Sequence, residues 1–87
     1  MLSQRQSTLG VCGDRRLEWW GVYHGTWVQV TLSSSCDREY RRTIWCWVIV
    51  RSLGEGRRAF VAAGDELFDE TSAIREAFDT LRREVRS

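Results

Sequence analysis

The chain contains no proline, no lysine, one histidine and three cysteines among its 87 residues. It also lacks an apolar run that approaches the roughly 20 residues a helix needs to cross a bilayer. Three cysteines, an odd number without paired spacing, do not form a disulfide framework. The residues from Met1 to Ser7 include no apolar segment that could serve as a signal sequence. We therefore expect a cytoplasmic protein with reduced thiols.

These scarcities also limit the chemistry that the chain can perform. His24 and Cys36 have no catalytic motif around them. A zinc site from Cys12, His24, Cys36 and Cys46 is disfavoured, because zinc ligands usually include pairs separated by roughly two to four residues. The acidic residues at 65–70 lack the glycine turn and distal glutamate of a calcium loop. We expect no metal, no cofactor and no enzymatic activity.

Length and charge are ordinary for a small globular protein. Eighty-seven residues suit one domain, and the hydrophobic content of 43% and charged content of 29% argue against wholesale disorder. The net charge of +1 gives no strong general attraction to nucleic acid or membranes. All basic residues are arginines, which the codon bias of a GC-rich genome explains more simply than a preference for bidentate contacts. Residues 1–13 are polar and aperiodic, so we expect a flexible N-terminal arm before a single domain at 14–87.

The stretch from Arg42 to Arg51 organises the rest of the chain. It is rich in β-branched and aromatic residues, which predicts a strand. Side chains alternate between the two faces of a strand. One face carries Ile44, Cys46, Val48 and Val50, and the other carries Thr43, Trp45, Trp47, Ile49 and Arg51. Both faces are apolar, which a strand half exposed to water should not be.

The other elements follow from periodicity and turn residues. We expect strands at 17–24, 27–32, 42–52 and 57–63, separated by glycine-containing turns or a serine-rich loop. An apolar stripe predicts an amphipathic helix at about 70–86, capped by Asp69 or Thr71. The expected fold is α+β: a four-stranded antiparallel β-meander with one C-terminal helix on one face (β-β-β-β-α). The helix entry at 68–77 is similar to that of many small bacterial and phage proteins, some antitoxins among them, but capping and amphipathicity alone produce this likeness and it identifies no family.

A cluster of tryptophans is the candidate functional surface. If Val28, Val30 and Leu32 face the helix together with Cys46 and its neighbours, the opposite face is aromatic. We therefore expect a binding surface formed by Trp19, Trp27, Trp45, Trp47, Tyr23, Arg42 and Arg51, where the position of a bulge at Gly21 decides whether Trp19 or Trp20 joins it. An exposed apolar patch of this size marks an interface more often than not.

Five explanations of this aromatic face remain open. The N-terminal arm could cover it, or the face assignment could be inverted so that the tryptophans form the core. A second copy of the chain, or a different protein, could pack against it. Single-stranded nucleic acid could stack on the rings beside the arginines. The sequence favours a non-enzymatic protein–protein interaction module, resembling an inhibitor, antitoxin or assembly subunit and able to form a homodimer, with single-stranded nucleic-acid binding as the alternative.

Overall fold

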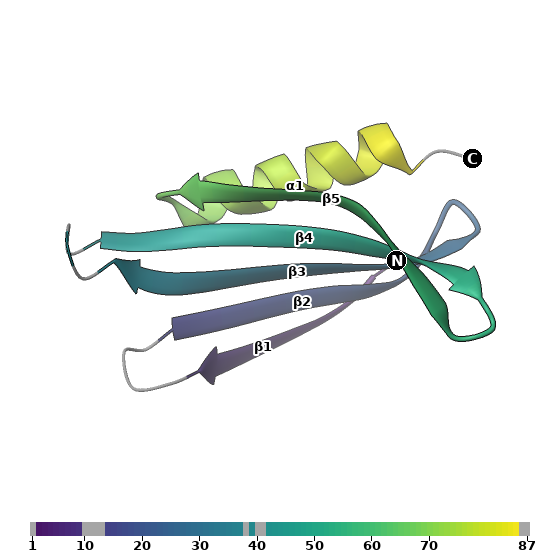
Figure 1. Cartoon of the computed structure of the whole chain (residues 1–87), viewed down its shortest axis with the longest axis horizontal. Coiled ribbons are helices and arrows are strands. Elements are labelled where there is room, and N and C mark those ends of the chain that lie inside the picture. Colours follow the sequence, from purple (N-terminus) through teal and green to yellow (C-terminus); the bar gives the residue numbers. More distant parts are fainter. Residues whose placement is uncertain (1, 10–13, 38, 40–41, 86–87) are drawn as a thin grey trace.

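The computed structural model describes residues 2–9, 14–37, 39 and 42–85. It consists of an antiparallel sheet followed by one helix, so the expected α+β class and the C-terminal helix are confirmed (Figure 1). The elements are β1 (Ser3–Leu9), β2 (Asp14–Tyr23), β3 (Thr26–Asp37), β4 (Arg42–Gly54), β5 (Arg57–Leu67) and α1 (Glu70–Glu84).

The sheet has five strands in the order β1-β2-β3-β4-β5, which corrects the expected four. The additional strand is β1, which lies within the expected N-terminal arm. It pairs with β2 without a register shift, from Ser3 opposite Trp20 to Leu9 opposite Asp14. Its polar residues gave no apolar alternation from which a strand could be predicted. Residues 1 and 10–13 of that arm lie outside the described residues.

Two tight turns fix the register at one end of the sheet. His24 and Gly25 have φ angles of 52° and 79°, and Glu55 and Gly56 have φ angles of 55° and 76°. Two consecutive residues with positive φ are characteristic of the type I′ turn, whose twist matches that of the flanking strands. Because consecutive strands run antiparallel, the β2–β3 and β4–β5 connections lie at the same end of the molecule (Figure 1).

The core lies between the sheet and α1. It contains Leu17 of β2, alternate residues of β3 and β4, and one stripe of the helix. The buried apolar residues are Leu17, Val28, Val30, Leu32, Trp45, Trp47, Ile49, Ala73, Ala77, Leu81 and Val85. The prediction that Val28, Val30 and Leu32 face the helix is thus confirmed.

The predicted orientation of β4 is wrong. Trp45 and Trp47 are only 6% and 5% exposed and belong to the core, whereas Cys46 is exposed on the other side. The register gives the physical reason: Trp47 stands opposite Leu32, and directly opposed residues share a face. The inverted assignment, one of the five alternatives, is therefore the one that the structure shows for these two rings.

The helix begins at a capping aspartate. Asp69 accepts hydrogen bonds from the backbone N–H of Ser72 at 3.0 Å and from its hydroxyl at 2.9 Å. These two hydrogen bonds lower the pKa of the Asp69 carboxyl, because they stabilise its charged form. Of the two predicted caps, Asp69 is the one used, and α1 ends at Glu84 rather than at residue 86.

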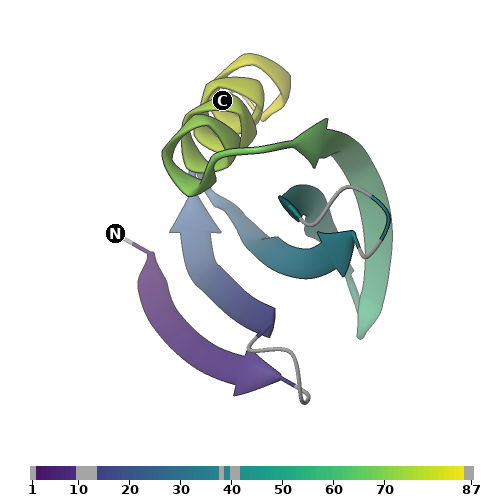
Figure 2. The same ribbon diagram turned by 90° about the vertical axis from the view of Figure 1, so that its left-hand side faces the viewer.

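The sheet is strongly curved, and α1 lies on its inner side (Figure 2). The helix backbone lies nearest β3, β4 and β5. Side chains also join it to β2, through the Trp19–Phe78 ring contact and the Arg15–Glu70 ion pair, while β1 extends beyond the helix. The opposite side of the sheet is covered by no described helix or strand. Within the described residues, no helix is both long enough and apolar enough to cross a membrane.

Candidate functional site: the outer face of the sheet

The outer face is the side of the sheet that points away from α1. Strand pairing places its residues in rows, because directly opposed side chains share a face. One row contains Arg5, Glu18, Thr31 and Val48, and the next contains Trp20, Gln29, Val50 and Phe60. Val22 and Trp27 form the pair beyond Trp20. This arrangement brings apolar residues from four strands together at the end of the sheet that carries the two tight turns.

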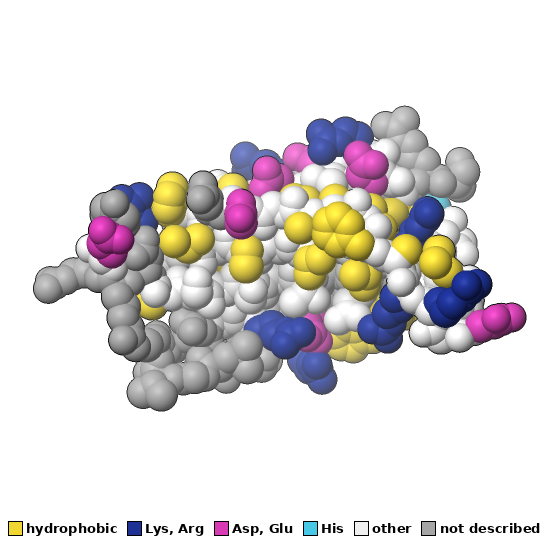
Figure 3. Space-filling view, in the orientation of Figure 1, with side chains coloured by type: hydrophobic (Ala, Val, Ile, Leu, Met, Phe, Trp, Pro, Cys, Tyr) yellow, Lys and Arg dark blue, Asp and Glu magenta, His cyan; other side chains and the backbone are white. Residues whose placement is uncertain are grey.

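We call the apolar part of this face the outer patch: Trp20, Val22, Trp27, Val48, Val50 and Phe60. Phe60 is 67% exposed and Val22 is 61% exposed, while the other four side chains are half-buried. Figure 3 shows hydrophobic side chains gathered over β4 and β5, bordered by arginines toward β1 and toward the β4–β5 turn. Of the seven residues predicted to form the binding surface, Trp27 is the one that lies in the outer patch.

Arginine side chains lie on both tryptophan rings of the outer patch. The Arg58 guanidinium carbon is 4.8 Å from the centre of the Trp27 ring, and Arg58 donates a hydrogen bond of 3.4 Å to the Gln29 side chain. The Arg5 guanidinium carbon lies 5.9 Å from the Trp20 ring. Such contacts between a cation and an aromatic face are attractive. The two rings are consequently held in place and partly shielded from water.

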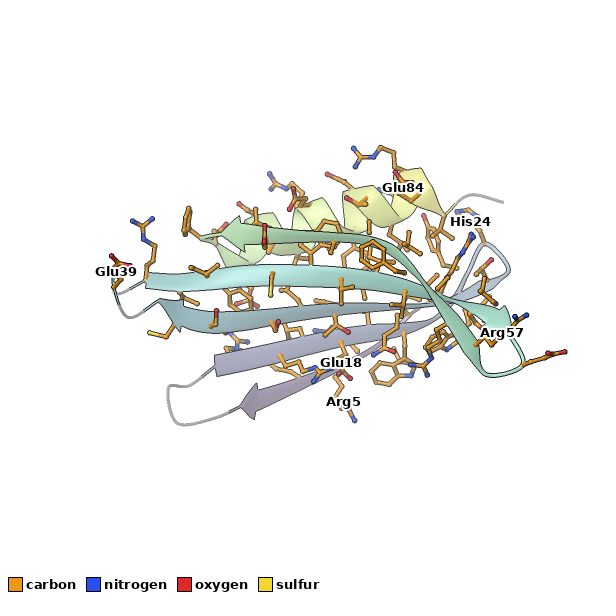
Figure 4. The ribbon with its side chains drawn as sticks, viewed as in Figure 1. Arg5, Glu18, His24, Glu39, Arg57 and Glu84 are labelled. Carbon is orange, nitrogen blue, oxygen red and sulfur yellow. The ribbon has the colours of Figure 1, made fainter. Side chains whose placement is uncertain are left out.

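A buried carboxylate borders the outer patch. Glu18 is only 7% exposed, and one of its oxygens accepts a hydrogen bond of 2.7 Å from Arg5 (Figure 4). Its other oxygen forms an ion pair with Arg16 at 2.9 Å. Both oxygens are thus compensated, as a buried charge requires. Beside this cluster, Trp20, Trp27 and Gln29 complete the walls of a hollow of about 150 Å³. The pair Arg5–Glu18 also links β1 to β2 on this face.

The structure separates the residues of the predicted binding surface. Trp27 is the one tryptophan of that set on the outer face. Trp19 lies on the helix side, with its ring edge-to-face against Phe78 at a centroid distance of 5.2 Å. Tyr23 is partly buried and packs against the core, and its ring lies edge-to-face against the His24 ring at a centroid distance of 4.3 Å. Trp45 and Trp47 are core residues, so they are unavailable to a partner.

The two predicted arginines lie away from the outer patch. Arg42, at the start of β4, stacks on the Phe68 ring with a distance of 4.7 Å to its centre. Arg51 is exposed near the far end of β4, and its register opposite Val28 places it on the helix side of the sheet. Neither residue contributes to the surface that the prediction assigned to it.

Sequence reasoning missed Val22 and Phe60 and preferred Trp19 to Trp20. The pairing of β2 with the core residues of β3 could have shown which side chains of β2 point outward. Trp19 stands opposite buried Val30, so Trp20 must point outward. Phe60 stands opposite Val50, and this pairing depends on register shifts in β5 that sequence does not reveal.

Trp47 occupies a close-fitting position on the inner side. Its indole N–H donates a hydrogen bond of 2.8 Å to the Glu76 side chain of α1. The ring also lies directly against the backbone of Gly64 on β5: a Cβ atom at Gly64 would be 2.5 Å from the indole nitrogen. This ring therefore connects β4, β5 and α1.

The reactive groups of the described residues are dispersed. Cys36 and Cys46 are exposed thiols, and Cys46 lies 3.2 Å from the Ser33 hydroxyl. His24 is at the β2–β3 turn, and Figure 4 shows it at the end of the molecule opposite Glu39. The part of the chain that the structure describes contains no group of three or more potential metal ligands. Cys12 lies outside it.

None of the protein families, characterised proteins or solved structures with which the chain was compared matches it. The outer face must therefore be interpreted from its own chemistry.

Proposed function

We propose that this chain is a non-enzymatic protein-binding module that docks a partner on the outer patch. The observation that carries the proposal is the exposure of Phe60 and Val22 beside two half-buried tryptophans on the face that α1 leaves uncovered. Monomeric proteins rarely expose large contiguous apolar patches, and such patches mark interaction sites.

The composition of the face supports a protein partner. Tryptophan, phenylalanine and arginine are enriched at interface centres, and an apolar centre with a polar rim is the usual arrangement. The view of Figure 1 presents an outline of 42 × 23 Å, which accommodates the roughly 800 Å² that each partner contributes to a standard interface.

Charge and shape indicate the chemistry of that partner. Arg5, Arg16 and Arg58 border the outer patch, and the nearby carboxylate of Glu18 is already paired with two of them. Arg57 follows the β4–β5 turn at the end of the molecule and precedes Arg58 in β5 (Figure 4). The outer face is also the convex side of the curved sheet (Figure 2). We therefore expect a partner with a flat or concave apolar surface and acidic residues at its rim.

Site-specific photocrosslinking in the producing cell would test this proposal. A photoreactive phenylalanine analogue at position 60 should crosslink to a partner, and the same analogue at Thr71 on α1 should not. Replacing Trp27 with alanine should remove the crosslink, because a central interface tryptophan contributes strongly to affinity. A crosslinked product of equal yield from both positions, or one insensitive to Trp27→Ala, would contradict docking on the outer patch.

Single-stranded nucleic acid is the second candidate, supported by the Trp20–Arg5 and Trp27–Arg58 pairs. Bases stack on aromatic rings and arginines neutralise phosphates. The arginines, however, already lie on the ring faces that bases would need. Titration with oligo(dT) and oligo(U) at low salt separates the two candidates. Nucleic-acid binding requires tryptophan quenching that weakens steeply with added salt, and a protein-binding surface predicts none.

A further inference from the structure

The strand β1 forms an unprotected edge of the sheet. Among the described elements it contacts β2 alone, and Figures 1 and 2 show it at the opposite side of the sheet from β5. An edge strand carries a row of unpaired backbone N–H and C=O groups that can pair with another strand. Proteins usually protect such edges with prolines, bulges, inward-pointing charges or a covering element.

The two edges of this sheet differ in protection. The pairing of β5 with β4 contains three register shifts, and α1 packs against β5. By contrast, β1 pairs with β2 in unbroken register, contains no proline, and has Arg5 as its one charged residue. The contrast indicates that β1, rather than β5, is the edge available for pairing.

The alternation of antiparallel hydrogen bonds identifies which groups of β1 are free. The two-residue turn at His24–Gly25 makes Tyr23 and Thr26 a hydrogen-bonded pair, so the odd-numbered residues of β2 bond to β3. Its even-numbered residues then bond to β1, and Glu18 stands opposite Arg5. Ser3, Arg5 and Ser7 therefore direct their backbone groups toward β2, while Gln4, Gln6 and Thr8 direct theirs outward.

A second copy of the chain fits these outward groups. Antiparallel pairing about a two-fold axis at Gln6 places Gln4 opposite Thr8 of the other copy and Gln6 opposite its own equivalent. All outward donors and acceptors of the three residues then form hydrogen-bonded pairs. Arg5 stands opposite Ser7 in this register. Shifting the two-fold axis to Arg5 would instead oppose two arginines, which is unfavourable.

We propose that the chain forms a two-fold symmetric dimer by antiparallel pairing of β1 with β1 of a second copy, creating a continuous ten-stranded sheet. This interface is separate from the outer patch and does not depend on the proposed function. It would place two outer patches on one extended surface.

Sedimentation equilibrium of the full chain and of two variants at Gln6 tests the proposal. Gln6→Pro removes the donor at the two-fold axis, yet an outward-facing N–H of an edge strand is where proline is tolerated. Gln6→Thr changes the side chain and keeps the donor. We expect twice the monomer mass for the native chain and for Gln6→Thr, and the monomer mass for Gln6→Pro with an unchanged circular dichroism spectrum.

Amide hydrogen exchange of the native chain gives a second test that requires no folded variant. Raising the protein concentration should slow exchange at Gln4, Gln6 and Thr8, whereas Ser3, Arg5 and Ser7 should exchange independently of concentration. A native monomer at every concentration would overturn the proposal. So would a dimer that Gln6→Pro retains and Phe60→Glu abolishes, since that dimer would use the outer patch.

Discussion

Gly64→Ala should destabilise the protein although the backbone at this position does not require glycine. The φ angle of Gly64 lies outside the positive region that favours glycine, so alanine can adopt its backbone conformation. In such a case the substitution normally stabilises a protein by about 0.4–1 kcal/mol, because it reduces the entropy of the unfolded chain. Here the expected sign is the opposite, because the space that a methyl group needs is filled by Trp47.

The magnitude follows from the contacts. The added Cβ would lie 2.5, 2.6 and 2.8 Å from the Nε1, Cε2 and Cζ2 atoms of Trp47. The ring is 5% exposed and is held by its hydrogen bond to Glu76, so it cannot move without disturbing the packing of α1. Overpacking of this kind typically costs about 1–3 kcal/mol. Weakening the hydrogen bond adds about 1 kcal/mol. After the entropic gain is subtracted, we expect a net loss of about 1–3.5 kcal/mol.

Urea unfolding followed by far-ultraviolet circular dichroism measures this loss directly. The control is a double-mutant cycle with Trp47→Leu, which removes the indole. In that background Gly64→Ala should be neutral or stabilising, so the two substitutions should be strongly non-additive. Equal destabilisation by Gly64→Ala in both backgrounds, or stabilisation of the native chain, would refute the steric explanation.

Three further predictions concern the helix and the two faces of the sheet. Glu76→Ala should lower the free energy of unfolding by about 1 kcal/mol, because it removes the acceptor for the Trp47 indole N–H. Glu76→Gln keeps an acceptor and should therefore lower it less. Equal losses of the two variants in urea unfolding would argue against the hydrogen bond. Hydrogen bonds lower the pKa of Asp69 in the folded state, so its contribution to stability should be present at neutral pH and lost as the pH falls through that pKa. Asp69→Asn should therefore reduce the fall in unfolding free energy at acid pH. An unchanged dependence of unfolding free energy on pH would exclude this coupling. Trp45→Ala should lower the free energy of unfolding by about 3–5 kcal/mol, because it truncates a core side chain. Phe60→Ala, a surface substitution, should change it by no more than about 0.5 kcal/mol. Similar unfolding temperatures for the two variants would contradict the face assignment.

The parts of the fold that sequence predicted were those where one face of an element is clearly polar. Val28, Val30 and Leu32 alternate with Gln29 and Thr31, so the buried side of β3 was evident. Asp69 precedes a helix with a single apolar stripe, which fixed the start of α1. In both cases local periodicity contains the information about burial.

Periodicity failed where both faces of a strand are apolar or both are polar. In the stretch from Arg42 to Arg51 either set of side chains could have been buried. The choice was made by the pairing of Trp47 with Leu32, a contact between distant positions. The opposite case is β1, whose polar residues form a strand because they pair with β2 in an unbroken antiparallel register. The candidate site was affected by the first failure, because it assigned Trp45 and Trp47 to the binding face in place of Val48 and Val50.

The arginines on the outer patch explain how a small protein can keep this apolar face exposed to water. Arg5 and Arg58 cover the rings of Trp20 and Trp27, which leaves Val22 and Phe60 as the most exposed apolar side chains of the outer patch. A contact between a guanidinium and an aromatic ring is worth about 0.5–1 kcal/mol in water and about 2 kcal/mol when desolvated. Docking a partner would therefore strengthen contacts that already exist, with both side chains already ordered. This preorganisation favours an interface in which the arginines remain on the rings over one in which a ligand displaces them.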